Sequence, residues 1–258
     1  MPVPYNSMHT IDINCDLGEG VSHDATLMKF ISSANIACGY HAGDQDTIKN
    51  TIELCLENGI AIGAHPGFDD KANFGRTEMQ LSDCELYDLV AEQITIMQTA
   101  CKEMGAILHH VKPHGALYNM AAKNATMSYI IAGVMKELDP QLILYGLSNS
   151  YMITEAKALN IKTASEVFAD RTYNAEGHLT PRSKPNAMIH RTEDALMQVL
   201  NMIQHKTVIS TDGLLVPLEA ETICIHGDGD QAVSFATSIY TTLNENNILI
   251  KPFSSIKC

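Results

Sequence analysis

The sequence has no tryptophan, and aromatic residues make up only 6% of its 258 positions. Sugar-binding sites commonly stack their ligands on aromatic faces, so a polysaccharide-processing enzyme is not indicated. Basic residues are also scarce, because 17 Lys and Arg stand against 30 Asp and Glu and give a formal net charge of −13. Nucleic acids and anionic membrane surfaces are bound by basic faces, so neither is expected as a partner.

Segments that would direct the chain out of the cytoplasm are missing as well. The first ten residues, MPVPYNSMHT, lack the basic and apolar regions of a secretory signal peptide. No apolar run approaches the length of a membrane span. The seven cysteines are scattered without a C-x-x-C pair, which indicates reduced thiols rather than a disulfide framework. We therefore expect a cytoplasmic protein.

What the sequence does contain is a regular alternation of apolar and amphipathic segments. Short apolar runs predict seven strands: TIDINCD (10–16), ANIACGY (34–40), IAIGAH (60–65), AILHHVK (106–112), LILYGL (142–147), IKTASEV (161–167) and TICIHGD (222–228). Helical periodicity follows Asp46 as far as Gly59, and it resumes at Thr192. Between them, Ser82 and Glu85 form a capping box that starts a helix ending before Gly105.

This alternation determines the fold class. Strands separated by helices pair in parallel, and near-continuous apolar runs indicate that both faces of the sheet are covered. We therefore predict an α/β fold, a distorted parallel (β/α) barrel of about seven strands that forms one domain over residues 1–258. Residues 169–190 interrupt the pattern as a long polar insertion, a length that is typical of a lid or a substrate clamp.

Polar residues gather where the predicted strands end. In a parallel barrel the carboxyl ends of the strands form the active site, so these residues are the candidates for function. They are Asp12, Asn14, Asp16, Glu19, Asn35, His41, Asp44, His65, Lys112, His114, Glu166, Asp170, Arg171, His226 and Asp228. The remaining histidines are interpreted as structural or surface residues: His9, His23, His109, His110, His178, His190 and His205.

The acidic residues of the first strand require partners. Asp12 and Asp16 alternate with apolar residues and so share one strand face, and an unpaired buried carboxylate costs several kcal/mol. We expect His or Lys from neighbouring strands, or a metal ion, to compensate them. Lys112 has two interpretations that the sequence leaves open: it neutralises the acidic residues, or it binds a substrate carboxylate or carbonyl.

Eight segments together resemble the LamB/YcsF family in sequence and order. They are DINCDLGEG, SANIACGYHAGD, IAIGAHPGFDD, FGRTEM, HHVKPHGALYN, YGLSNS, EVFADRTYNAEGHLTPRS and ICIHGDG. The match runs from Asp12 to the segment after Asp230. Tyr40 stands where the family usually has Phe, and Cys15 where it often has Ala.

The resemblance implies the A subunit of an ATP-dependent 5-oxoprolinase, which opens 5-oxo-L-proline to L-glutamate together with subunits B and C. It further implies a barrel related to glycoside hydrolases and deacetylases, ATP as co-substrate with Mg²⁺, and no tightly bound organic cofactor. Homo-oligomerisation stays open. The sequence has neither a G-x-G-x-x-G after its first strand nor a P-loop motif, which agrees with a nucleotide site that depends on the other subunits.

On this resemblance we assign two groups of residues. The catalytic candidates are Asp16, Glu19, His41, His65, His114 and Glu166. The substrate-binding candidates are Asn35, Lys112, Asp170, Arg171, Arg182, His226 and Asp228. His65 or His114 would be the general base for water, while Lys112 with Arg171 or Arg182 would hold the substrate carboxylate or the phosphoryl group.

Two other functions are compatible with the same residues. In a metal-dependent, deacetylase-like amidohydrolase acting without ATP, the metal ligands would be drawn from Asp12, Asp16, His41 and His65. Alternatively, the chain is a binding or scaffolding subunit whose partners perform the chemistry. Metal content, ATP dependence and substrate binding by the isolated chain would distinguish these possibilities.

Overall fold

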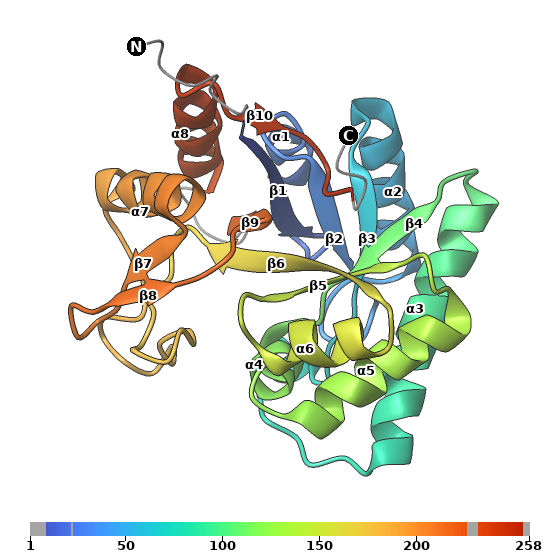
Figure 1. The fold of residues 1–258 in the computed structure, drawn as a ribbon. Coiled ribbons are helices and arrows are strands. Elements are labelled where there is room, and N and C mark those ends of the chain that lie inside the picture. The colour runs from blue at the N-terminus through green and yellow to red at the C-terminus, as the bar shows by residue number, and fades with distance from the viewer. Residues whose placement is uncertain (1–8, 22, 226–231, 255–258) are drawn as a thin grey trace.

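The computed structural model describes residues 9–21, 23–225 and 232–254, and seven parallel strands form a closed barrel at its centre (Figure 1). Around the barrel the strands follow chain order, and pairing of β1 with β9 closes the ring. These strands are β1 (Thr10–Leu17), β2 (Ser33–Ala37), β3 (Ala61–His65), β4 (Leu108–Val111), β5 (Ile143–Leu147), β6 (Lys162–Phe168) and β9 (Thr222–Ile225). Each of them overlaps one of the seven predicted runs, so the predicted barrel is confirmed.

Helices surround the barrel and cover its apolar outer face (Figure 1). They are α1 (Asp24–Leu27), α2 (Gln45–Asn58), α3 (Asp83–Glu103), α4 (Gly115–Ala121), α5 (Ala125–Leu138), α6 (Tyr151–Ala158), α7 (Thr192–His205) and α8 (Ala232–Glu245). The predicted capping box of α3 is present, since the Ser82 hydroxyl accepts from the Glu85 amide and the Glu85 carboxylate accepts from the Ser82 amide. Gly59 ends α2 with φ 66°, in the left-handed region that favours glycine.

Strand β1 shows why the barrel has a polar interior. Its alternate residues Ile13, Cys15 and Leu17 belong to the apolar core, while Asp12 and Asp16 bond to side chains of other strands. Because side chains alternate across a strand, one face of β1 packs against helices and the other points into the ring. The polar groups of the sequence are thereby collected inside the barrel.

Several short elements have no counterpart in the prediction. They are the antiparallel pair β7 (Thr207–Ile209) and β8 (Leu215–Pro217), the strand β10 (Leu249–Ile250) beside the start of β1, and the 3₁₀ turn η1 (Lys71–Asn73). Ile209 and Leu215 are largely exposed, so β7 and β8 lack the apolar run that marks a buried strand. After β10, the Phe253 side chain packs against Ile143 and Tyr145 of the barrel.

The polar insertion at 169–190 is folded. Two antiparallel bridges, Arg171 with Met188 and Tyr173 with Leu179, fold it back on itself. The Thr211 amide, beside β7, donates to the Tyr173 carbonyl, so the insertion and the β7–β8 hairpin lie side by side (Figure 1). Its role as a lid or clamp stays a prediction.

Candidate active site at the carboxyl end of the barrel

The Asp12 carboxylate is buried inside the barrel and accepts hydrogen bonds from three hydroxyls. Ser32, Ser33 and Thr222 donate to it at 2.5, 2.8 and 2.6 Å, and we call these four residues the hydroxyl layer. Burial raises the pKa of Asp12 although the hydroxyls oppose the shift. Our expectation of a His, Lys or metal partner is therefore wrong for Asp12, because hydroxyls on β2, β9 and the residue before β2 compensate it.

Asn35 connects the hydroxyl layer to the groups above it. Its amide nitrogen donates to Asn14 and to Asp16, both at 2.8 Å, and its oxygen lies 2.8 Å from Nε2 of His110. The His110 ring stacks on Tyr145, with 4.0 Å between ring centroids. These contacts occupy Asn35, our substrate-binding candidate, so the structure places it behind Asp16 as a positioning residue. His110 is structural, as predicted.

The Lys112 side chain lies inside the barrel and contacts two buried carboxylates, those of Asp16 and Glu166. Its Nζ lies 2.9 Å from Asp16 Oδ1 and 2.9 Å from Glu166 Oε1, and it also contacts Asn14 and the Cys224 thiol at 3.1 Å each. Burial by itself would lower the pKa of the ammonium, but the Asp16 and Glu166 charges outweigh it and hold that pKa well above its usual value. Lys112 thus neutralises the acidic residues, and it also lines the cavity described below.

Four further side chains converge above Lys112, and we call Glu19, His41, His65 and His114 the histidine cluster. Glu19 Oε1 lies 3.2 Å from His41 Nε2, 3.4 Å from His114 Nδ1 and 3.9 Å from His65 Nε2. The His65 and His114 nitrogens that face each other are 2.9 Å apart. The His41 and His114 rings stack with 3.8 Å between centroids. Each residue offers one ligand atom, and these four atoms all lie within 4.8 Å of one another, so the cluster could hold a metal ion.

Glycines provide the space for this packing. A Cβ on Gly75, whose φ is 64°, would lie 2.8 Å from the His41 Cβ and 3.0 Å from the His114 ring. A Cβ on Gly115 would lie 2.6 Å from the Gly75 carbonyl oxygen. Both residues therefore have to be glycine for the loop after β3 to press the two rings together.

The imidazoles of the cluster are strongly desolvated. Burial, reinforced by the neighbouring His65, lowers the pKa of His41 to about 3 and that of His114 to about 2. At neutral pH both rings are therefore uncharged. A neutral imidazole has a lone pair on one ring nitrogen, so these rings can accept a hydrogen bond or bind a cation.

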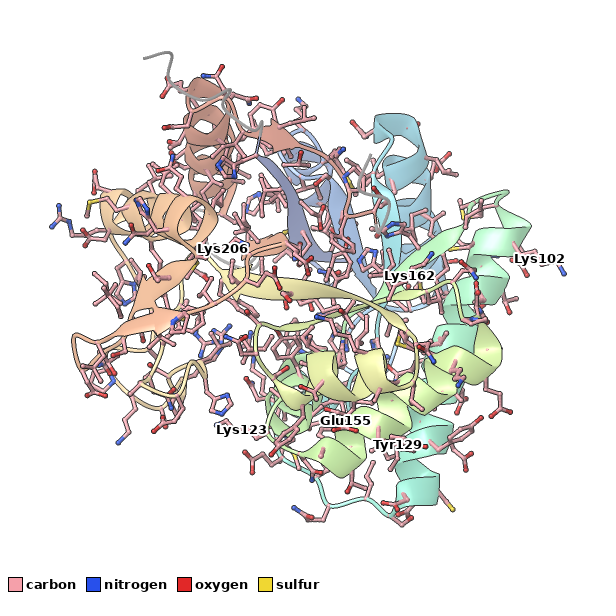
Figure 2. All side chains as sticks on the ribbon, viewed as in Figure 1. Lys102, Lys123, Tyr129, Glu155, Lys162 and Lys206 are labelled. Carbon is pink, nitrogen blue, oxygen red and sulfur yellow. The ribbon has the colours of Figure 1, made fainter. Side chains whose placement is uncertain are left out.

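A cavity of about 410 Å³ opens onto the cluster from one side. Its wall includes the candidates Asp16, Glu19, His65, Lys112, His114, Arg171 and Arg182. The structure adds Arg76, Glu78 and Lys123, which were not among the candidates, and Lys123 is labelled beside α4 in Figure 2. Arg76 and Glu78 lie in FGRTEM, a segment whose resemblance to the family was the only signal for them.

The other candidates occupy varied positions. Glu166 is fully buried behind Lys112. Arg171 donates to the carbonyls of Thr180 and Ala187 and so supports the 169–190 insertion as well as lining the cavity. Burial, followed by the nearby Arg182 charge, lowers the pKa of Arg171 to about 10. The Asp170 carbonyl accepts from the Ile189 amide at the base of the insertion.

Two substrate-binding candidates cannot be placed, and the ligands named for the amidohydrolase alternative are only partly brought together. His226 and Asp228 lie outside the described residues. Of the four ligands named for the amidohydrolase alternative, His41 and His65 belong to the histidine cluster and Asp16 lies 3.4 Å from His65 Nε2. Asp12 belongs to the hydroxyl layer instead. The residues that complete the cluster with His41 and His65 are Glu19 and His114.

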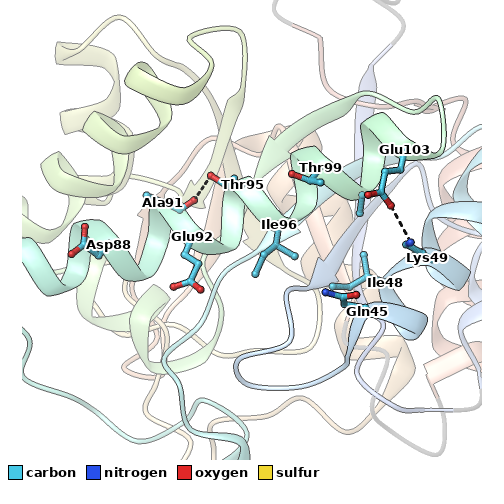
Figure 3. Close-up of a pocket in the computed structure, with 11 residues that line it drawn as sticks. Gln45, Ile48, Lys49, Asp88, Ala91, Glu92, Thr95, Ile96, Thr99 and Glu103 are labelled. Carbon is cyan, nitrogen blue, oxygen red and sulfur yellow. Dashed lines mark hydrogen bonds and ion pairs between the residues drawn. The ribbon is translucent and has the colours of Figure 1, made fainter.

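A larger hollow of about 560 Å³ lies on the outside of the barrel, between α2 and α3 (Figure 3). Ile48 and Ile96 line it, and an ion pair between Lys49 and Glu103 of 3.0 Å spans one end. It contains none of the candidate residues, and we assign no catalytic role to its wall.

In the described part of the chain, every helix is too short or too polar to cross a membrane.

Known proteins resemble this chain in sequence and in fold. The profile of the LamB/YcsF family matches residues 11–258. A relative from Tolumonas auensis, named as the A subunit of 5-oxoprolinase, is 47% identical over 95% of this chain and 99% of its own. The crystal structure of the lactam utilization protein from Thermus thermophilus has a TM-score of 0.89 and 36% identity, and covers 95% of this chain and 100% of that one.

A more distant likeness concerns the fold alone. The catalytic domain of a peptidoglycan N-acetylglucosamine deacetylase from Eubacterium rectale has a TM-score of 0.52 at 12% identity, over 97% of this chain and 91% of that one. The predicted relation to deacetylase-type barrels is thereby confirmed for the fold.

Proposed function

The chain belongs to the LamB/YcsF family, and we propose that it is the A subunit of a 5-oxoprolinase that opens the lactam of 5-oxo-L-proline to L-glutamate. The reaction consumes ATP and releases ADP and phosphate. The relatives that carry the 5-oxoprolinase name support this function, since they match this chain over nearly its whole length and theirs.

One observation carries the proposal: a single cavity joins a proton-accepting cluster to a cationic wall. Glu19, His65 and His114 line one part of it, while the cationic side chains of Arg76, Lys123, Arg171 and Arg182 line another. A small carboxylic acid with a lactam ring needs both, because its carboxylate requires a cation and its ring carbon requires an activated water. The volume lies at the lower end of the range for small-molecule sites.

The chemistry explains the need for ATP. A lactam is a poor electrophile, and transfer of the terminal phosphoryl group to its oxygen forms an O–P bond, releases ADP and leaves a phosphorylated imidate. Water then attacks the ring carbon, the C–N bond breaks with a proton delivered to nitrogen, and an acyl phosphate results. A second water releases phosphate and leaves the new carboxylate of glutamate.

We assign the roles within this sequence from position. His65 or His114 accepts the proton of the attacking water, because both border the cavity. Asp16 and Glu19 orient the water or take the lactam proton. Arg171 and Arg182 hold the substrate carboxylate or the phosphoryl group, and Lys112 with Glu166 maintains the charge and position of Asp16.

We further propose that the active form is a cytoplasmic complex with subunits B and C, and that ATP enters as its Mg²⁺ complex. Subunits B and C would complete the nucleotide site, because the sequence carries neither of the nucleotide motifs sought above.

The experiment measures glutamate formed from 5-oxoproline by this chain, alone and with subunits B and C, with and without ATP. We expect glutamate only when all three subunits and ATP are present. ATP-independent hydrolysis of an amide by the chain alone, abolished by a chelator, would instead establish the metal-dependent amidohydrolase.

A further inference from the structure

Hydrogen bonds on the outer side of the histidine cluster fix the orientation of two of its rings. His65 Nδ1 lies 2.6 Å from the Lys112 carbonyl oxygen, and His114 Nε2 lies 2.9 Å from the Phe74 carbonyl oxygen. A carbonyl oxygen can only accept, so these two nitrogens carry N–H groups. The opposite nitrogens, His65 Nε2 and His114 Nδ1, face each other across 2.9 Å and are the ring atoms that a ligand at the centre of the cluster would meet.

Carboxylate oxygens lie beside the same two nitrogens. Glu19 Oε1 lies 3.4 Å from His114 Nδ1, and Asp16 Oδ2 lies 3.4 Å from His65 Nε2. Carboxylate oxygens and imidazole nitrogens that converge on one point attract a cation placed there.

The spacing of the ligand atoms suits a metal ion. Zinc binds histidine nitrogen and carboxylate oxygen at about 2.0–2.2 Å, which separates neighbouring ligand atoms of a tetrahedron by roughly 3.3 Å. The separations in the cluster are 2.9 Å between the His65 and His114 nitrogens and 3.2, 3.4 and 3.9 Å from Glu19 Oε1 to His41, His114 and His65. These four separations scatter around the tetrahedral value, and because the His41 and His114 rings are stacked in parallel, one of the two has to rotate for both to bind the same ion.

The surroundings of the ligands have the form that metal sites require. Histidines that bind metals usually donate their second N–H to a backbone carbonyl or a carboxylate, which fixes the tautomer. His65 and His114 have this arrangement through the Lys112 and Phe74 carbonyls. Because Glu19, His65 and His114 also line the cavity, an ion can reach the site from solvent.

We propose that Glu19, His41, His65 and His114 bind one divalent transition-metal ion of the zinc type. With four protein ligands the coordination of such an ion would be complete, so its role would be to hold the rings and Glu19 in place beside the cavity. A bound ion would occupy the nitrogens of His65 and His114 that could otherwise accept a proton, so with the ion present the base of the proposed function would be Asp16, which also lines the cavity. Metal binding is measured without ATP, substrate or the other subunits, so its failure and the failure of the proposed function can be distinguished.

The test uses the full chain, stripped with EDTA and freed of chelator by dialysis. Titration with Co²⁺ is followed by visible absorption, which reports four-coordinate geometry, and titration with Zn²⁺ is followed by calorimetry. We expect one ion per chain, displacement of Co²⁺ by Zn²⁺, and a Zn²⁺-dependent rise in the thermal unfolding midpoint. A folded chain that takes up no ion would overturn the proposal, and an extra proton between His65 and His114 would then account for their contact.

Variants locate the site. His114→Ala and Glu19→Gln should weaken Zn²⁺ binding by about 100-fold or more, since even removing an outer partner of a ligand costs 10–100-fold. His205→Ala, at an exposed position on α7, is the control and should bind as the parent does. Asp12→Asn should also bind normally, because its carboxylate belongs to the hydroxyl layer. Far-UV circular dichroism confirms that each variant is folded, and unchanged Zn²⁺ affinity in folded His114→Ala contradicts the assignment.

Discussion

The hydroxyl layer and the histidine cluster lie in the same barrel, and both are buried polar groups, yet they are organised in opposite ways. In the hydroxyl layer, donors and acceptors match, because three hydroxyls point at the Asp12 carboxylate. In the histidine cluster, ring nitrogens face one another and a carboxylate oxygen instead, as the contacts of His114 Nδ1 with His65 Nε2 and Glu19 Oε1 show. Of these two regions, the histidine cluster is the one that opens onto the cavity.

The difference separates structure from function inside one barrel. A polar network that satisfies itself contributes to a unique fold and leaves little capacity for a ligand. A group of converging nitrogen and carboxylate atoms beside a cavity can accept a cation, as we propose for the histidine cluster. Asp12 and Asp16 are both buried, so burial does not distinguish the two carboxylates. Their partners do, because Asp12 contacts hydroxyls whereas Asp16 contacts Lys112 and lines the cavity.

The largest expected effect comes from removing one ring of the histidine cluster. His114→Ala should reduce glutamate formation by the complex with subunits B and C by on the order of 10³-fold, because a group that moves a proton contributes about that much. Far-UV circular dichroism should stay unchanged, since the change lies at the cavity. His205→Ala serves as the control, and normal turnover in folded His114→Ala would remove this residue from the mechanism.

A methyl group placed below the cluster should damage the fold rather than the chemistry. A Cβ on Gly63 would overlap the His110 imidazole, which Asn35 and the Tyr145 ring hold in place. Gly63→Ala should therefore lower the free energy of unfolding by about 3 kcal/mol or more, as measured by urea denaturation.

Gly133→Ala is the matched control for that change. Gly133 lies within α5, and a Cβ at this position would meet no atom of a neighbouring element within 4 Å. Alanine should therefore raise the free energy of unfolding by about 0.5–1 kcal/mol. If both glycine variants had the parent's stability, the barrel interior would be more loosely packed than the structure indicates.

The two regions should also differ in the sign of their pH dependence. Unfolded histidines protonate near their ordinary pKa of 6.5, while His41 and His114 in the fold have pKa values of about 3 and 2 and stay neutral down to that pH. Below pH 6.5 the unfolded chain therefore binds more protons, and stability falls by up to about 1.4 kcal/mol per pH unit for each ring. Asp12 acts oppositely, because its raised pKa contributes stability that is lost as pH rises above 3.8.

The measurement is thermal unfolding of the chain in EDTA between pH 8 and 5. The midpoint should fall as the pH is lowered through 6.5, and His41→Ala should make the decline shallower. A midpoint independent of pH over this range would show that the rings take up protons in the fold as readily as in the unfolded chain.

The smallest effect is expected from the hydroxyl layer itself. Asp12→Asn keeps the shape and still accepts hydrogen bonds at its oxygen, so the free energy of unfolding should fall by only about 1–2 kcal/mol. Zn²⁺ binding and glutamate formation should stay within about twofold of the parent. Loss of either in a stable Asp12→Asn variant would erase the distinction between the two regions.

The seven barrel strands and the caps of α2 and α3 could be predicted because they depend on local signals. Alternating or continuous apolar runs, the Ser82–Glu85 pair and the terminal Gly59 act within a few residues of the chain. The β7–β8 hairpin and β10 escaped prediction, since strands of two or three residues with exposed Ile209 and Leu215 carry no such pattern.

For the candidate site, the sequence selected several residues that the structure brings together at one end of the barrel, but it did not predict which of them contact one another. His41, His65 and His114 could be selected because each lies at or just after the end of a predicted strand. Asn35 was selected with them, yet it supports Asp16 from behind. Arg76 and Lys123 follow no strand directly, so position along the chain gave no reason to place them on the cavity wall.

The sequence by itself determined the alternation of strands and helices, the polar face of β1 and the placing of histidines at strand ends, because periodicity and capping are short-range. The tertiary structure decided which polar groups meet. Closure of the ring brings β1, β3 and β4 together, and only then do the Lys112 and Phe74 carbonyls select the tautomers of His65 and His114. A tautomer depends on a partner distant in sequence, so it is set in space and not along the chain.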